Sequence, residues 1–124
     1  SGASTTVLVC DDDPDITDLV EQQLRKAGFT VHVCHSAESA LQDFDTANPD
    51  IVLLDATLGE VAGTHVAKAL RERGASIPIL LFSSIHPRLG RTMAIDSGCD
   101  DFLAKPASAA TLIAKIRQLS AQTA

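Results

Sequence analysis

The chain has 124 residues, a length typical of one domain, with 45% hydrophobic residues, 21% charged residues and a formal net charge of −6. The negative charge argues against a general nucleic-acid surface, because phosphate binding needs a basic face. No run of about 18 apolar residues and no basic-then-apolar leader occurs, so we predict a cytoplasmic protein without a membrane span or signal peptide.

Charge and cysteine carry further information. Residues 1–60 contain 12 acidic and 2 basic residues, whereas residues 61–124 contain 4 acidic and 8 basic ones. An acidic first half is compatible with a cation site or a basic partner.

The odd number and irregular spacing of Cys10, Cys34 and Cys99 argue against a disulfide framework, so we expect reduced, mostly buried thiols. No C-x-x-C pair occurs, and the histidines lack metal-ligand spacing with the cysteines, which argues against structural zinc.

Five short apolar runs predict strands. Unbroken runs are typical of parallel strands that are buried on both faces, and this describes the first, third and fourth. His32 interrupts the second run, which suits an edge strand, and the fifth run is weak. In chain order the runs are Thr6–Cys10, Phe29–Cys34, Ile51–Leu54, Ile79–Phe82 and Phe102–Leu103.

A helical pattern follows each run. Caps and glycine stops mark the ends of these helices, and apolar residues three and four apart mark their inner faces. The first helix begins at Pro14 after the cap Asp13, with an inner stripe of Ile16, Leu19, Val20 and Leu24 before Gly28. The second helix follows Ser36 and turns Leu41 and Phe44 inward, and the third runs over Gly63–Arg73 with Val66 and Leu70 inward. The fourth runs over Leu89–Ser97. The fifth follows Ser108, and its inner residues are Leu112, Ile113, Ile116 and Leu119.

Five alternations of strand and helix predict an α/β fold, a doubly wound five-stranded parallel sheet in a three-layer sandwich. In such folds the functional site lies beyond the carboxyl ends of the strands. Charged or hydroxyl residues follow four of the five predicted strands at this edge. They are Asp11, Asp12 and Asp13 after the first strand, Asp55 after the third, Ser83 and Ser84 after the fourth, and Lys105 after the fifth.

These residues suit one chemistry. Clustered carboxylates repel one another unless a cation is present, and oxygen-only ligands favour magnesium. An aspartate beside magnesium can attack a phosphoryl group, while Lys105 and Ser83 contact its other oxygens. Taken singly, Asp11, Asp13 or Asp55 could equally be a cap or turn residue, and Ser83 or Lys105 a solvated one, so the joint placement carries the prediction.

Four segments together resemble a known family. They are Val7–Pro14, Pro49–Asp55, Pro78–Ser83 and Gly98–Pro106. In that order they resemble the acidic opening strand, the phosphoacceptor strand, the strand ending in Ser or Thr, and the closing Lys-Pro motif of response-regulator receiver domains of bacterial two-component signalling. The resemblance covers nearly the whole chain. We therefore interpret residues 6–121 as one receiver domain and residues 1–5 as a disordered N-terminal segment or cloning remnant.

The resemblance implies the roles of the acidic residues. Asp55 would accept a phosphoryl group from a phospho-histidine of a sensor histidine kinase or a histidine phosphotransfer protein. Asp12 and Asp55 would bind magnesium directly and Asp11 through water, with the backbone carbonyl of Thr57 as a further ligand.

It also implies a switch. Ser83 would swing to bond one phosphoryl oxygen while Lys105 pairs with another, and Phe102, at the family's aromatic switch position, would move inward with Ser83. The fold would be flavodoxin-like with strand order 2-1-3-4-5 and a cis bond between Lys105 and Pro106. The fourth helix, fifth strand and fifth helix would form the partner face, with homodimer formation on phosphorylation. The basic residues Arg88, Arg91, Lys115 and Arg117 are candidates for it.

The chain departs from the family pattern at several positions. Gly59 replaces the usual proline, which predicts a looser loop after Asp55, and Ala62 replaces a usual acidic residue. Phe102 lacks the hydroxyl of the commoner tyrosine. Ile85 cannot orient a water molecule, so we expect slow loss of the phosphoryl group. An Ile85→Glu variant with an unchanged phosphoryl half-life would contradict that expectation.

Two alternatives remain at this point. The Asp11–Asp13 segment resembles the D-x-D motif of haloacid-dehalogenase-type phosphatases. In this chain, however, Lys105 follows the acidic pair Asp100–Asp101 instead of preceding it. Labelling of Asp11→Asn against Asp55→Asn separates the two nucleophiles. The other alternative is a receiver-like interaction module that acts without phosphorylation. His86 is interpreted as a surface loop residue.

Overall fold

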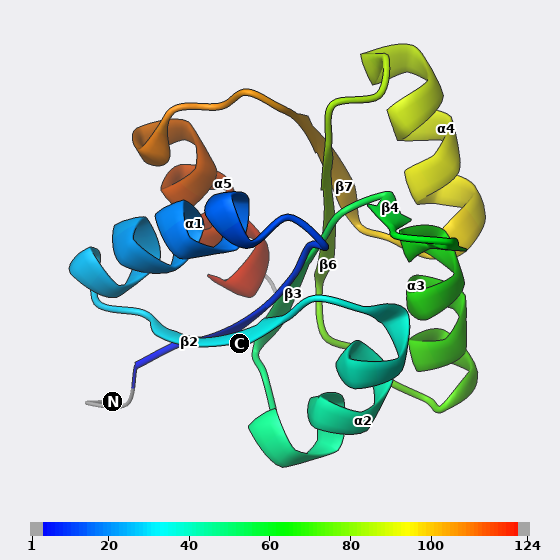
Figure 1. Ribbon diagram of the computed structural model, residues 1–124, viewed down its shortest axis with the longest axis horizontal. Helices are drawn as coiled ribbons and strands as arrows, with labels where there is room; N and C mark the ends of the chain where they lie inside the picture. The colour runs from blue at the N-terminus through cyan, green and yellow to red at the C-terminus, as the bar shows by residue number, and fades with distance from the viewer. Residues whose placement is uncertain (1–3, 122–124) are drawn as a thin grey trace.

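The protein, seen in a computed structural model that describes residues 4–121, forms a central parallel sheet between two layers of helices (Figure 1). The sheet has the order β2-β1-β3-β6-β7, which confirms the predicted order 2-1-3-4-5. Its strands are β1 (Thr6–Cys10), β2 (Thr30–Cys34), β3 (Ile51–Leu54), β6 (Ile79–Ser83) and β7 (Asp101–Ala104). Residues 1–3, part of the segment expected to be disordered, lie outside the described residues.

Burial of the strands follows their place in the sheet. Every residue of β3 and β6 is buried, as in β1 after its first residue, because helices cover both faces. The edge strands β2 and β7 retain partly exposed residues. The unbroken apolar runs therefore identified the three central strands correctly, and His32 marked an edge.

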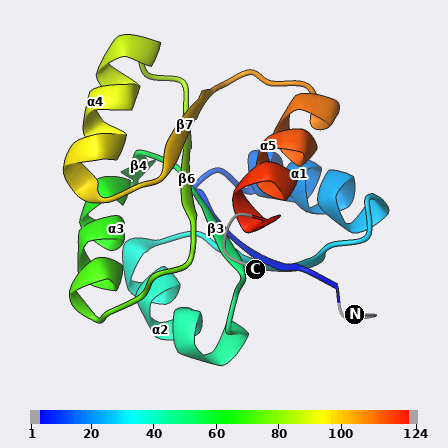
Figure 2. The ribbon, with the colours of Figure 1, turned by 180° about the vertical axis from the view of Figure 1, so that it is seen from behind.

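The helices are α1 (Pro14–Lys26), α2 (Ala37–Ala47), α3 (Gly63–Glu72), α4 (Pro87–Ser97) and α5 (Ala109–Ala121). Figure 2 shows α1 and α5 on one face of the sheet and α2, α3 and α4 on the other. Each layer buries its own apolar cluster, with Leu24 and Ile116 on the first face and Val66 and Leu70 on the second. None of these described helices is long and apolar enough to cross a membrane.

The predicted helix caps are confirmed. Asp13 Oδ1 accepts the Asp15 N–H at 3.0 Å, and Ser108 Oγ accepts the Thr111 N–H at 3.1 Å. Ser36 and Ser39 form a reciprocal capping box at the start of α2. Short polar side chains thus satisfy amide groups that the first turn of a helix leaves without partners.

Two local predictions are corrected, and one short element was not predicted. Leu19, placed in the inner stripe of α1, is 56% exposed, because the stripe that faces the sheet passes through Thr17, Val20 and Leu24. Helix α4 begins at Pro87 rather than Leu89, and His86 is its N-cap, with Nδ1 accepting the Arg88 N–H at 3.1 Å. After Asp55 the chain forms a short antiparallel hairpin, β4 (Thr57–Leu58) and β5 (Val61–Ala62), which the sequence analysis did not predict.

Candidate functional site

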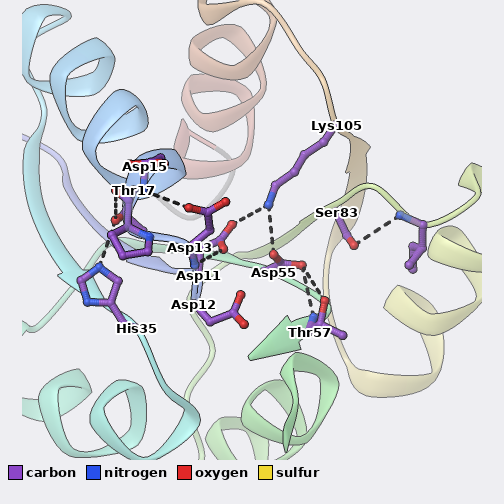
Figure 3. Close-up of polar contacts among 12 residues, drawn as sticks. Asp11, Asp12, Asp13, Asp15, Thr17, His35, Asp55, Thr57, Ser83 and Lys105 are labelled. Atoms are coloured by element: carbon purple, nitrogen blue, oxygen red, sulfur yellow. Dashed lines mark hydrogen bonds and ion pairs between the residues drawn. The ribbon is translucent and has the colours of Figure 1, made fainter. Parts of the chain in front are cut away.

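The site begins with the register of the sheet. Strand β1 aligns Cys10 with Leu54 of β3, so Asp11 and Asp55 leave neighbouring strands at the same level. Strand β6 aligns Ser83 with Ala104 of β7, so Lys105 leaves the sheet at the same edge. The parallel ladder thus brings these polar residues together at one edge of the sheet (Figure 3).

Three carboxylates converge there. One carboxylate oxygen from each of Asp11, Asp12 and Asp55 lies within 4.8 Å of the other two. Asp11 is 4% exposed and Asp55 is 8% exposed, whereas Asp12 is exposed. Asp13 serves as the cap of α1 instead. The oxygen-only donor set is consistent with the divalent metal site of a receiver domain.

Backbone and side-chain donors fix Asp55. Its N–H donates to the Cys10 carbonyl at 2.9 Å. Its Oδ1 accepts the Thr57 N–H at 3.2 Å and lies 3.5 Å from the Thr57 hydroxyl, and its Oδ2 accepts from Lys105 Nζ at 3.0 Å. The carboxylate is therefore oriented from both sides.

Lys105 joins the two buried carboxylates. Its Nζ also forms an ion pair with Asp11 Oδ2 and lies 5.3 Å from the centre of the Phe82 ring. Burial lowers the pKa of Lys105, but its hydrogen bonds to Asp11 and Asp55 and the charges of both carboxylates outweigh burial and raise the pKa above 10.5. The side chain remains protonated at neutral pH. The following Lys105–Pro106 bond is cis, which confirms the expectation drawn from the family.

Burial dominates the pKa of Asp11. Burial raises this pKa above 3.8, the hydrogen bonds from Lys105 and the Asp13 amide lower it, and the Asp55 charge raises it again. The net direction is upward, so the folded protein resists ionisation of Asp11. Positive charge near the cluster would relieve this resistance.

The remaining predicted residues lie nearby but are not bonded to Asp55. The Ser83 hydroxyl is buried and accepts the Ile85 N–H at 3.4 Å, and no hydrogen bond joins it to Asp55 among residues 4–121. Phe102 is 7% exposed and turned inward, with its ring where a Cβ at Gly90 would stand. The aromatic side chain thus lies inward while the Ser83 hydroxyl bonds Ile85.

Sequence reasoning missed two glycines of the site. The Gly59 N–H donates to Asp12 Oδ2 at 3.0 Å and holds the exposed carboxylate of the cluster. Gly63, treated only as a helix start, lies against the peptide of Asp55. Both contacts depend on backbone atoms that only the folded chain brings together, so the sequence did not indicate them.

The basic residues are dispersed over the surface. Lys115 Nζ pairs with Asp101 at 2.7 Å on the α5 side of β7. Arg117 donates to the Ala27 carbonyl at 3.3 Å and lies over the Phe29 ring, and so faces the C-terminal end of α1. Arg117 therefore lies on the α1 side of α5, although it was suggested for the partner face of α4, β7 and α5.

Sequence comparisons identify relatives of this chain. The model of the family described as response regulator receiver domain matches residues 7–117. The sensory transduction protein RegX3 of Mycobacterium tuberculosis (strain ATCC 25618 / H37Rv) is 39% identical over 113 residues, which cover 91% of this chain and 49% of RegX3. The transcriptional regulatory protein TrcR of the same strain is 34% identical over 118 residues, 95% of this chain and 46% of TrcR. The chain spans about half the length of the curated relatives it matches.

Solved structures give the same result. The BeF3-activated N-terminal receiver domain of Klebsiella pneumoniae RstA superposes with a TM-score of 0.88 at 26% identity, covering 94% of this chain and 98% of that one. A putative response regulator from Chloroflexus aurantiacus J-10-fl superposes with a TM-score of 0.90 at 28% identity, covering 96% of this chain and 99% of that one.

Proposed function

The chain belongs to the family of response regulator receiver domains, and from that premise we propose that Asp55 accepts a phosphoryl group from a phospho-histidine. The donor would be a sensor histidine kinase or a histidine phosphotransfer protein. The observation that carries the proposal is the setting of Asp55: a carboxylate at the end of a central strand, beside Asp11 and Asp12 and bonded to Lys105.

The proposed step is a displacement at phosphorus. An Asp55 carboxylate oxygen attacks the phosphorus of the phospho-histidine, and an O–P bond forms as the P–N bond breaks. The histidine nitrogen leaves with the bonding electrons and takes a proton from solvent. Asp55 suits this role because Thr57 and Lys105 already orient its carboxylate.

We propose magnesium as the metal, held by Asp11, Asp12, Asp55 and the backbone carbonyl of Thr57. The donor set fits, since three carboxylates supply oxygen alone and the pKa of Asp11 is raised by burial beside Asp55. When bound, magnesium supplies positive charge that neutralises the oxygens of the transferring phosphoryl group. Lys105, which stays charged, pairs with one of those oxygens.

Ser83 and Phe102 are proposed to transmit the change. The hydrogen bond that holds the Ser83 hydroxyl is long, at 3.4 Å, so its release for a phosphoryl oxygen costs little. Phosphorylation would shift an existing equilibrium of Ser83, Phe102 and α4, and thereby the surface of α4, β7 and α5. Leu89 and Ile95 are 55% and 77% exposed on α4, which suits a partner or homodimer face.

We propose that the protein is a cytoplasmic signalling module. Its catalysis is limited to its own phosphorylation and dephosphorylation, and its output is binding.

The test is intact mass after incubation with acetyl phosphate and magnesium. We expect one added phosphoryl group in the wild type and in the exposed-surface control Asp96→Asn, and none in Asp55→Asn or with a chelator. Labelling that survives in Asp55→Asn but is lost in Asp11→Asn would overturn the proposal in favour of a phosphatase-type nucleophile. No labelling of folded wild type would overturn it in favour of an interaction module that acts without phosphorylation.

A further inference from the structure

A second group of metal-ligating side chains lies at the edge of the sheet. His32 and Cys34 alternate along β2 and therefore project from the same face, toward α2. Asp43 of α2 meets both: its Oδ2 lies 3.1 Å from His32 Nε2 and 3.4 Å from Cys34 Sγ. One atom from each residue lies within 4.8 Å of the other two.

The two separations that involve Asp43 approach those of a tetrahedral metal site, and the third lies within 4.8 Å. Zinc bonds of about 2.0–2.1 Å to nitrogen, 2.0–2.2 Å to oxygen and 2.3 Å to sulfur put tetrahedral ligand atoms roughly 3.4–3.6 Å apart. The observed contacts of Asp43 Oδ2, 3.1 Å to His32 and 3.4 Å to Cys34, differ from that by a few tenths of an ångström. Rotations about side-chain bonds supply such shifts without movement of the backbone.

The burial of the three side chains also suits an ion. Cys34 is 2% exposed and supplies sulfur from inside the protein. The His32 and Asp43 side chains are 41% and 39% exposed, so an ion can enter between them from solvent. The hydrogen bonds of Asp43 to His32 and Cys34 lower its pKa, which keeps the carboxylate ionised.

We infer that His32, Cys34 and Asp43 form a site for a borderline divalent transition metal of the zinc class, with water at a fourth position. Binding forms an S–metal bond as the Cys34 S–H bond breaks, and the proton goes to solvent. The mixed nitrogen, sulfur and oxygen donors favour zinc or cobalt over magnesium, unlike the oxygen-only cluster of Asp11, Asp12 and Asp55. The ion would link the edge strand β2 to α2.

Zinc was not predicted from the sequence because no C-x-x-C pair occurs and the histidines lack the usual spacing to the cysteines. His32 and Cys34 are two residues apart on a strand and Asp43 follows nine residues later on a helix, so only the packing of α2 on β2 brings the three together. Metal binding by His32, Cys34 and Asp43 does not depend on phosphorylation at Asp55. Either proposal can therefore be disproved without affecting the other.

Cobalt titration with saturating magnesium tests the site, because a cobalt–thiolate bond gives a near-ultraviolet charge-transfer absorption that carboxylates do not produce. We expect this absorption at one cobalt per chain in the wild type and its loss in Cys34→Ser. It should persist in Asp55→Asn, which removes a ligand of the acidic cluster, and in Cys99→Ser, which removes a different thiol. Absorption that persists in Cys34→Ser overturns the inference.

Because Cys34 is buried, Cys34→Ser could fail to fold, so substitutions at the two more exposed ligands give a second test. His32→Gln and Asp43→Asn should each weaken zinc binding by more than about tenfold, the low end for loss of even an outer-shell partner. The matched exposed controls His65→Gln and Asp45→Asn should bind as the wild type does. Zinc should raise the unfolding midpoint of the wild type and of the controls. Equal zinc affinity in His32→Gln, Asp43→Asn and the controls overturns the assignment.

Discussion

Gly63 occupies a position where no side chain fits. A Cβ there would stand 1.7 Å from the carbonyl oxygen of Asp55 and 2.8 Å from its carbonyl carbon. The Gly63 N–H donates to the Ala56 carbonyl at 2.7 Å, which keeps the two backbones together. The start of α3 thus rests directly on the peptide of the proposed phosphoacceptor.

We expect Gly63→Ala to lower the free energy of unfolding by about 3 kcal/mol or more, the upper range of overpacking costs. The obstructing atoms belong to the backbone, so the strain cannot be relieved by a rotamer change. Asp55 would be displaced with its peptide, and labelling by acetyl phosphate should fall as well. Urea unfolding and intact mass measure the two effects.

Gly28→Ala is the matched control. Gly28 has a φ of +99° but open space around its missing side chain, so alanine there meets only backbone strain of about 1–2 kcal/mol. A Gly63→Ala protein no less stable than Gly28→Ala would contradict the close approach. The chemical residues of the site could be predicted because they end strands, whereas this steric requirement arises only from the folded path of the hairpin.

At the scale of elements, α4 contains an interior glycine for a packing reason. Glycine weakens a helix by about 1 kcal/mol relative to alanine. A Cβ at Gly90, however, would lie 2.3 Å from Cε1 of Phe102, because α4 packs its Gly90 face onto the inward ring from β7. Glycine at this position lowers helix propensity but allows α4 and β7 to pack closely.

Gly90→Ala should therefore destabilise the protein by about 1 kcal/mol, since overpacking costs of about 1–3 kcal/mol exceed the gain in helix propensity. In a Phe102→Leu background the same change should be neutral or stabilising, because the ring atoms it meets are absent. Urea unfolding of the four proteins gives the coupling between the two sites. Equal effects in both backgrounds would refute the contact.

Elements could be predicted to different degrees from the sequence. The three central strands are unbroken apolar runs because helices cover both of their faces. The prediction of these strands from the sequence was confirmed. The start of α4 was misplaced because an unusual cap, His86, precedes Pro87. The β4–β5 hairpin was missed because two residues per strand carry no periodicity.

At the scale of the whole molecule, the fold brings together the two halves of an unevenly charged chain. The first half supplies Asp11, Asp12 and Asp55, and the second half supplies Lys105 to the same cluster. One partly buried cation beside two buried carboxylates leaves the cluster short of positive charge. Ionisation of Asp11 is therefore less favourable in the folded protein than in the unfolded chain unless a metal adds positive charge.

This shortage predicts a pH dependence of the metal-free protein. Burial raises the pKa of Asp11 in the folded state above its ordinary value of 3.8. Between these two pKa values, Asp11 is protonated in the folded protein and ionised in the unfolded chain. The stability due to that proton is fully present below the unfolded pKa and is lost as pH rises through the folded pKa. The raised pKa of Lys105 keeps its charge constant over this window.

Urea unfolding of the wild type and of Asp11→Asn in a chelator should reveal the effect. Asparagine cannot ionise, so the stability of the wild type relative to Asp11→Asn should fall as the pH rises above about 4 and through the raised pKa of Asp11 in the folded protein. The exposed-surface variant Asp96→Asn should follow the wild type. A relative stability that rises with pH would reverse the sign and mean that Lys105, rather than burial, dominates Asp11. Magnesium should abolish the fall if the acidic cluster binds it, because a bound cation favours the ionised carboxylate.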